Sequence, residues 1–78
     1  MSWNYRILAH ETEDDFYLQI HEVYYDENGI PDGYTEKPVN VGGDDIKEIL
    51  RVIDKMKDCT EKSILFAGDE FPKEYKLK

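Results

Sequence analysis

The sequence predicts an α+β fold, in which a three-stranded antiparallel meander carries one amphipathic helix packed on one face. Three observations support it. Residues 2–10 and 15–27 alternate apolar and polar side chains, Asn28-Gly29 marks a hairpin turn, and residues 44–58 change to a helical period. With 78 residues the chain has room for a single small domain, 1–78.

The first two strands are expected to form a hairpin around a polar loop at residues 11–14. If His10 pairs with Asp15, the apolar side chains of both strands fall on one side, whereas a shift of one residue would separate them. His21 then lies opposite Asn4, far from the loop. We expect the apolar side to be the core, formed by Tyr5, Ile7, Ala9, Phe16, Leu18 and Ile20.

A third strand is expected at residues 30–38. Asn28-Gly29 suits a type I′ turn, in which both central residues have positive φ. Pro31 has no amide hydrogen to donate, so this strand belongs at an edge of the sheet, with Tyr34 opposite Val23.

Residues 44–58 show the pattern of a capped helix. Asp45 is a candidate N-cap, followed by Glu48 three residues later. One apolar stripe should pack on the core side of the sheet, and it comprises Ile46, Ile49, Leu50, Ile53 and Met56. After the helix, residues 63–67 are either a fourth strand or a strap over the core. The tail, 68–78, is expected to fray unless Phe71 and Tyr75 anchor it.

The charge of the chain is strongly negative and uneven. Eighteen Asp and Glu residues oppose ten Lys and Arg residues, giving −8, and residues 1–40 alone carry nine acidic and two basic residues, a net charge of −7. This disfavours nucleic acid and anionic membranes as direct partners and favours a basic protein. The alternative is that the acidity only keeps the protein soluble.

The residues that could carry chemistry form no recognisable catalytic or metal motif. His10 is followed by four carboxylates in residues 11–15, but neighbouring carboxylates in a loop are usually solvated, so we expect no metal site and no cofactor. Cys59 is the single cysteine, which excludes an internal disulfide and fits a cytoplasmic setting. The N-terminal residues lack the pattern of a secretion signal. We therefore expect no catalytic residues and no enzyme.

Strand alternation places several tyrosines on the side of the sheet away from the helix, where acidic residues border them. Tyrosine is enriched at protein interfaces because it offers a large contact area with a polar tip. The candidate partner-binding residues are Tyr17, His21, Glu22, Tyr25, Asp26, Glu27, Asp32, Tyr34 and Glu36. The alternative is that the C-terminal segment folds over this side and completes the core.

Two blocks, "WNYR" at residues 3–6 and "IHEVYYDENGIPDGYTEKPV" at residues 20–39, resemble a group of short uncharacterised bacterial proteins. These begin with the same strand, continue through IHEVYY and a glycine turn, and end in an acidic-capped helix. The resemblance covers roughly the first 60 residues. It implies a bacterial source and one folded unit of sheet and helix, and it assigns no functional residues.

The first functional hypothesis is a small acidic, non-enzymatic interaction module or inhibitor that binds a basic protein surface, with carboxylates that could stand in for nucleic-acid phosphates. The second is a structural homodimer formed through the tyrosine-bearing side of the sheet. A small-ligand or metal-dependent activity near His21 ranks last.

Overall fold

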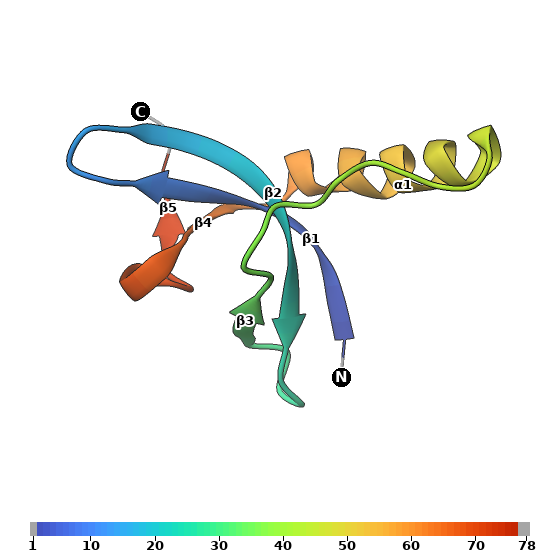
Figure 1. The fold of residues 1–78 in the computed structure, drawn as a ribbon. Coiled ribbons are helices and arrows are strands. Elements are labelled where there is room, and N and C mark those ends of the chain that lie inside the picture. The colour runs from blue at the N-terminus through green and yellow to red at the C-terminus, as the bar shows by residue number, and fades with distance from the viewer. Residues whose placement is uncertain (1, 77–78) are drawn as a thin grey trace.

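The computed structural model describes residues 2–76, which form a curled five-stranded sheet and one α-helix (Figure 1). The elements are β1 (Ser2–Glu11), β2 (Phe16–Tyr25), β3 (Pro31–Tyr34), α1 (Ile46–Asp58), β4 (Ile64–Phe66) and β5 (Glu74–Tyr75). The sheet order is β3-β2-β1-β4-β5. A mixed fold with one helix is confirmed, but the expected meander is only part of a larger sheet.

The register of the β1–β2 hairpin differs from the expected one by two residues, since Ile7 pairs with Ile20 and Ala9 with Leu18. The reason lies in the turn. The Thr12 amide donates to the Asp15 carbonyl at 2.8 Å, and the Asp15 amide donates to the Thr12 hydroxyl at 3.0 Å. The loop therefore begins one residue later than expected. A shift of two residues leaves every side chain on its expected side of the sheet.

The β2–β3 turn is also built differently from the expected type I′ turn. Gly29 has a φ of 78°, but no non-glycine residue has positive φ among those the structure describes, Asn28 included. Instead, the Asp26 carboxylate accepts hydrogen bonds from the amides of Asn28 and Ile30, at 2.9 and 3.0 Å. A side chain that satisfies two loop amides favours a longer turn with one left-handed glycine.

The outer strands extend the hairpin on both sides. β3 is an edge strand, as expected from Pro31, and Tyr34 lies opposite Val23 as predicted. β4 occupies the expected fourth-strand segment and pairs parallel to β1, with Leu8 opposite Leu65. Parallel strands need a crossover connection, and α1 lies in it. Within residues 68–76 the tail forms a 3₁₀ turn and β5. Phe71 packs against the core and Tyr75 pairs with Ile64, which is the anchored alternative; residues 77–78 lie outside the described range.

The core lies on the opposite side of the hairpin from the expected one. Leu8, Val23 and Leu65 are its buried centre, and Tyr25, Tyr34, Ala67 and Phe71 pack against them. Of the expected core on the Ile7 and Leu18 side, Ala9 alone is fully buried, whereas Phe16 and Leu18 are exposed, so that expectation is wrong for the rest of the set. Both sides of the hairpin carry apolar residues, and the segment after β4 folds back across the Leu8 side and buries it.

The helix begins as predicted, but its apolar stripe does not pack as predicted. The Asp45 carboxylate accepts from the Glu48 amide at 2.9 Å. Of the residues in α1, Met56 alone is buried, whereas Ile46, Leu50 and Ile53 are exposed. Figure 1 shows why, because α1 extends away from the sheet and lies close to it only at its C-terminal end. The radius of gyration, 13.2 Å, exceeds the value of about 11.5 Å expected for a compact domain of this length.

Candidate functional site

The nine candidate partner-binding residues do not form one surface. His21 is 1% exposed, and Tyr25 and Tyr34 pack against the core, so the alternative in which the C-terminal segment covers this side is the one observed. Glu22 lies on the other side of the sheet, in register with Tyr5. Four of the nine remain exposed, and they are Tyr17, Glu27, Asp32 and Glu36; Asp26, half-buried, caps the β2–β3 turn.

A pair of histidines lies between the hairpin and the covering segment. The Nε2 atoms of His10 and His21 are 3.0 Å apart, and His21 Nδ1 lies 2.9 Å from the carbonyl oxygen of Thr35. The expectation that His21 lies opposite Asn4 is wrong, because the two-residue shift pairs it with Arg6. The His10 ring stacks on Tyr17, with centroids 5.0 Å apart.

The hydrogen bonds define which nitrogen carries each proton. A carbonyl oxygen only accepts, so His21 donates through Nδ1 to Thr35 and its Nε2 is free to accept from His10 Nε2. Burial lowers the pKa of both imidazoles; for His21 the hydrogen bond to Thr35 opposes this and the neighbouring His10 adds to it. The pair is therefore held neutral, with both Nε2 atoms engaged with each other.

A buried arginine lies on the same side of the hairpin as the histidine pair and joins three segments of the chain. Arg6 donates from Nη1 to the Tyr25 hydroxyl at 2.9 Å, and from Nη2 to the Ser63 carbonyl and hydroxyl oxygens at 2.7 and 2.8 Å. The Tyr25 hydroxyl in turn donates to Asn4 Oδ1 at 2.7 Å. This network joins β1, β2 and the segment before β4 through one guanidinium group. Tyr25 is thus a structural residue whose hydroxyl is already engaged.

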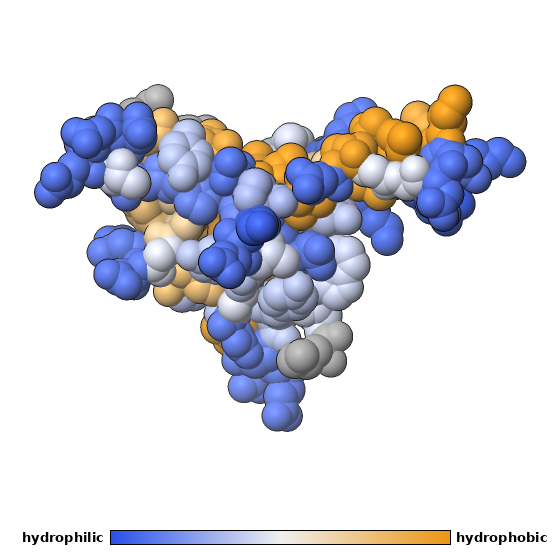
Figure 2. Space-filling model, viewed as in Figure 1, coloured by the Kyte–Doolittle hydropathy of each residue, from blue (hydrophilic) through white to orange (hydrophobic). Residues whose placement is uncertain are grey.

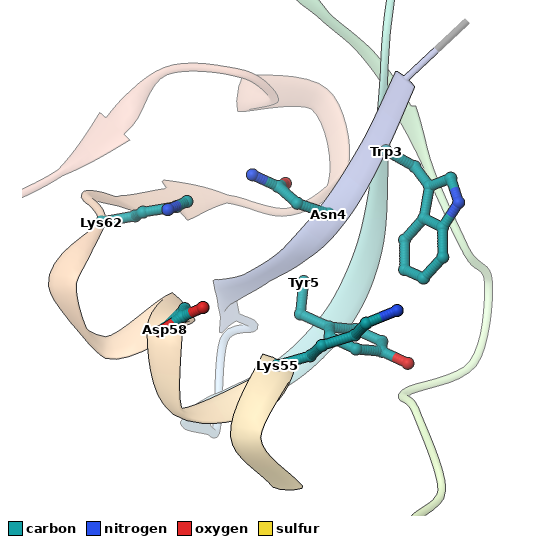
Figure 3. A pocket seen from close by; sticks show the side chains of 6 residues that line it. All are labelled: Trp3, Asn4, Tyr5, Lys55, Asp58 and Lys62. Carbon is teal, nitrogen blue, oxygen red and sulfur yellow. The ribbon is translucent and has the colours of Figure 1, made fainter. Parts of the chain in front are cut away.

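An open notch of about 370 Å³ lies between β1 and the end of α1 (Figure 3). Its lining residues are Trp3, Asn4, Tyr5, Lys55, Asp58 and Lys62. Lys55 Nζ lies 5.8 Å from the centroid of the Trp3 ring, a cation–π distance, and Trp3 meets Tyr5 edge to face. The lining offers aromatic stacking, two lysine cations and one carboxylate.

Two kinds of site can be assessed directly. Among residues 2–76 no three His, Cys, Asp or Glu side chains come close enough to share a metal ion. Burial raises the pKa of the Cys59 thiol, although the nearby Arg6 opposes this. A thiol held protonated is a poor nucleophile, so Cys59 packs as a small apolar side chain.

Sequence reasoning missed three residues that build this region, namely Arg6, His10 and Thr35. Strand alternation puts Arg6 on the side of the hairpin away from the expected core, where an arginine usually points to solvent. A local pattern gives no sign of its partner Ser63, which is 57 residues away. The signal available was the presence of three polar side chains, Arg6, His10 and His21, on the same side of a hairpin as Leu8 and Val23.

The carboxylates are largely left without cationic partners. Within residues 2–76 one ion pair forms, between Lys73 and Glu70 at 3.8 Å, and both of its side chains are more than half exposed. The last residue of β1 and the loop after it hold four exposed acidic residues, Glu11, Glu13, Asp14 and Asp15. In the same described range, no helix combines the length and apolar composition needed to cross a bilayer.

Comparisons with known proteins returned no match among family models, curated proteins or solved structures. The resemblance of residues 3–6 and 20–39 to short bacterial proteins therefore stays a prediction.

Proposed function

We propose that this chain is a small, non-enzymatic interaction module that binds a basic surface of a partner protein in the reducing cytoplasm. The observation that carries the proposal is the lack of ion pairs around the acidic residues of the N-terminal half, within the range that the structure describes. A carboxylate without a cationic partner in its own chain contributes negative electrostatic potential at the surface. Such a potential steers a cationic partner toward that surface.

The hairpin loop is the part of the surface that fits this role best. Glu11, Glu13, Asp14 and Asp15 project from one end of the β1–β2 hairpin, with Tyr17 exposed beside them. The exposed acids of the other predicted set are Glu27 in the β2–β3 turn, Asp32 in β3 and Glu36 just after β3. A basic partner can thus be attracted by two groups of carboxylates.

The polar groups that could support catalysis are instead used in the structure. His10 and His21 engage each other, and Arg6 donates a hydrogen bond to Tyr25. General acid–base catalysis needs a titratable group within hydrogen-bonding reach of a bound substrate. Arg6 and His21 are buried, at 8% and 1% exposure, which supports a binding role for the protein.

The proposal can be tested by titrating the protein with poly-lysine at low and high ionic strength. A variant with Glu11→Gln, Glu13→Gln, Asp14→Asn and Asp15→Asn removes four negative charges from the loop. The matched control, Asp54→Asn, Asp58→Asn, Glu61→Gln and Glu74→Gln, removes four negative charges that each have a lysine beside them in sequence. Both variants have a net charge of −4, because each loses four of the eight excess negative charges.

We expect the loop variant to bind about tenfold more weakly and the control to bind nearly as the parent does. High salt should weaken binding of the parent and the control. Equal losses in both variants would mean that only total charge matters, and the proposal would fail. If the partner also binds nucleic acid, duplex DNA can be added to its complex with this protein. Release of this protein would support phosphate mimicry, and a complex that persists would exclude that mechanism.

A further inference from the structure

The outward side of α1 is an apolar stripe that no other part of the described chain covers. Ile46, Leu50 and Ile53 are 74%, 54% and 45% exposed, and they follow each other at intervals of four and three residues. Val52 and Met56 lie on the adjoining flank of the helix and are half-buried and buried. The helix therefore has two apolar flanks, of which the chain uses one.

A second apolar surface lies uncovered on the hairpin. Phe16 and Leu18 are 48% and 43% exposed, and they lie on the same side of the sheet as the half-buried Ile7 and Ile20. Figure 2 shows the apolar colour running along α1 and continuing toward the hairpin on the upper edge of the molecule. Helix and hairpin end thus form one apolar band, with the helix at one end and Phe16 and Leu18 at the other.

The size of the band matches one half of a protein dimer. The exposed parts of the α1 stripe and of Phe16 and Leu18 amount to roughly 400 Å² of apolar area, before Ile7 and Ile20 are counted. A standard interface buries about 800 Å² per partner, of which a little over half, about 450 Å², is apolar. In addition, α1 has 13 residues, a length at which an isolated helix is marginal in water, so cover over its outer flank stabilises it.

The charge along the helix is close to balanced. Residues 44–58 contain four basic and five acidic residues, a net charge of −1, whereas residues 11–15 carry four acidic residues and no basic one. The four cations of the helix offset its own carboxylates, so the helix repels the acidic end of a second copy only weakly.

We propose that the apolar band is the interface of a two-fold symmetric homodimer, in which α1 of each copy packs across the Phe16 and Leu18 end of the other copy's hairpin. A two-fold axis through the middle of the band produces both contacts at once, because it exchanges the two ends. The helix of one copy then covers the Phe16 and Leu18 side of the other copy's hairpin, which that copy's own helix leaves exposed. The tyrosine-bearing side, covered by the C-terminal segment, takes no part.

The test is sedimentation of the full chain over a range of concentrations up to about 1 mM. The parent is expected to sediment with twice the mass of one chain. Leu50→Glu, in the middle of the stripe, and Leu18→Lys, on the hairpin, should each give a monomer. Ile30 lies in the β2–β3 turn and is 54% exposed, as Leu50 is, so Ile30→Glu and Ile30→Lys are matched controls that should remain dimeric. Circular dichroism verifies that each variant is folded.

Mixing the two monomeric variants tests the arrangement itself. In a mixed dimer, the glutamate that replaces Leu50 in one chain would meet the lysine that replaces Leu18 in the other, and the second contact would be unchanged. We expect mixing Leu50→Glu with Leu18→Lys to restore the dimer. If helices paired with helices, mixing Leu50→Glu with Leu50→Lys would restore it instead, and the proposed arrangement would be wrong.

Two other results overturn the proposal outright. One is a parent protein that stays monomeric at every concentration, which would leave the band to a foreign protein. The other is a dimer that Leu50→Glu and Leu18→Lys leave intact. Dimerisation is measured without poly-lysine, and binding to poly-lysine can be repeated with the monomeric Leu50→Glu variant, in which no second copy covers the hairpin end, so either proposal can fail without the other.

Discussion

His10 and His21 share a hydrogen bond across the β1–β2 hairpin, with their Nε2 atoms 3.0 Å apart. The arrangement works only while at least one facing nitrogen lacks a proton, because two N–H groups repel each other at this distance. His21 is committed to donating through Nδ1 to Thr35. Protonation of His21 therefore places a proton on the nitrogen that faces His10.

The stability of the fold should consequently decrease at mildly acidic pH. The pKa of both histidines is lowered in the folded state, so the unfolded chain binds more protons once the pH falls through the ordinary value of 6.5. The free energy of unfolding should thus be constant above that value and decline below it. Urea unfolding at several values between about pH 5.5 and 7.5 measures how the free energy of unfolding changes with pH. Carboxylates stay ionised over this range and do not contribute to the change. His21→Gln should make the free energy of unfolding depend less on pH. An unchanged pH dependence in this variant would show that other groups cause it.

Removing the Arg6 side chain should destabilise the protein strongly. Arg6→Ala leaves the Tyr25 hydroxyl and the Ser63 carbonyl without a donor on the covered side of the sheet. We expect a loss of about 2–3 kcal/mol in the free energy of unfolding, measured in urea. Arg51→Ala removes an exposed arginine from α1 and should change stability by less than about 0.5 kcal/mol. Similar losses in both variants would show that the network contributes little.

The position of the core can be tested by comparing two aliphatic truncations. Leu8→Ala removes a fully buried side chain and should cost about 2–5 kcal/mol. Ile53→Ala, which the sequence alone predicted to be a core substitution, should cost much less at a dilution where the protein is monomeric. Thermal melting of both variants decides between the two sides of the hairpin. A larger loss for Ile53→Ala would place the core back on the helix side.

The Tyr34 hydroxyl should hold the C-terminal segment in place. It accepts a hydrogen bond from the Gly68 amide at 2.6 Å, and the Tyr34 ring lies 4.7 Å from that of Phe71. Tyr34→Phe keeps the ring contact and removes the acceptor, at a cost of about 0.5–1.5 kcal/mol. Amide hydrogen exchange at Gly68 should then be faster than in the parent. Exchange at Val23 should change only by the amount that corresponds to the lower free energy of global unfolding. Unchanged exchange at Gly68 would contradict the contact.

Two adjacent glycines before the helix should respond differently to alanine. A Cβ at Gly43 would lie 2.7 Å from Glu48 Cβ, a contact that no side-chain rotation relieves, whereas a Cβ at Gly42 meets nothing within 4 Å. Glu48 also accepts from the Asp44 amide at 2.8 Å, so displacing it disturbs the start of α1. Gly43→Ala should cost about 1–3 kcal/mol and Gly42→Ala almost nothing, as measured by circular dichroism during thermal melting. Equal effects would mean that the segment before α1 shifts freely.

Local patterns predicted the local features of this fold. Alternation assigned each side chain of β1 and β2 to its side, and Asp45 with Glu48 located the start of α1. The turn types failed because side chains set them: Thr12 moved the first turn by one residue, and Asp26 lengthened the second.

The core and the candidate site depended on distant parts of the chain. Both sides of the hairpin carry apolar residues, and the choice between them rests on the path of the chain after β4. That path buries His21 and divides the predicted partner-binding residues between two sides of the sheet and the turn. No periodicity in residues 15–38 contains this information, since the covering residues lie thirty or more positions later.

The parallel pairing of β1 with β4 also dictates an order of events during folding. The pairing of Leu8 with Leu65 forms late in folding. The two residues are far apart in sequence, so a long loop of chain must be ordered before they can pair. Until then β1 presents an unpaired edge, which other nascent chains can extend by strand addition. A polypeptide that stops before residues 64–66 leaves the edge unpaired at Leu8 and Ala9 as well, so truncation products of this protein should aggregate more readily than the full chain.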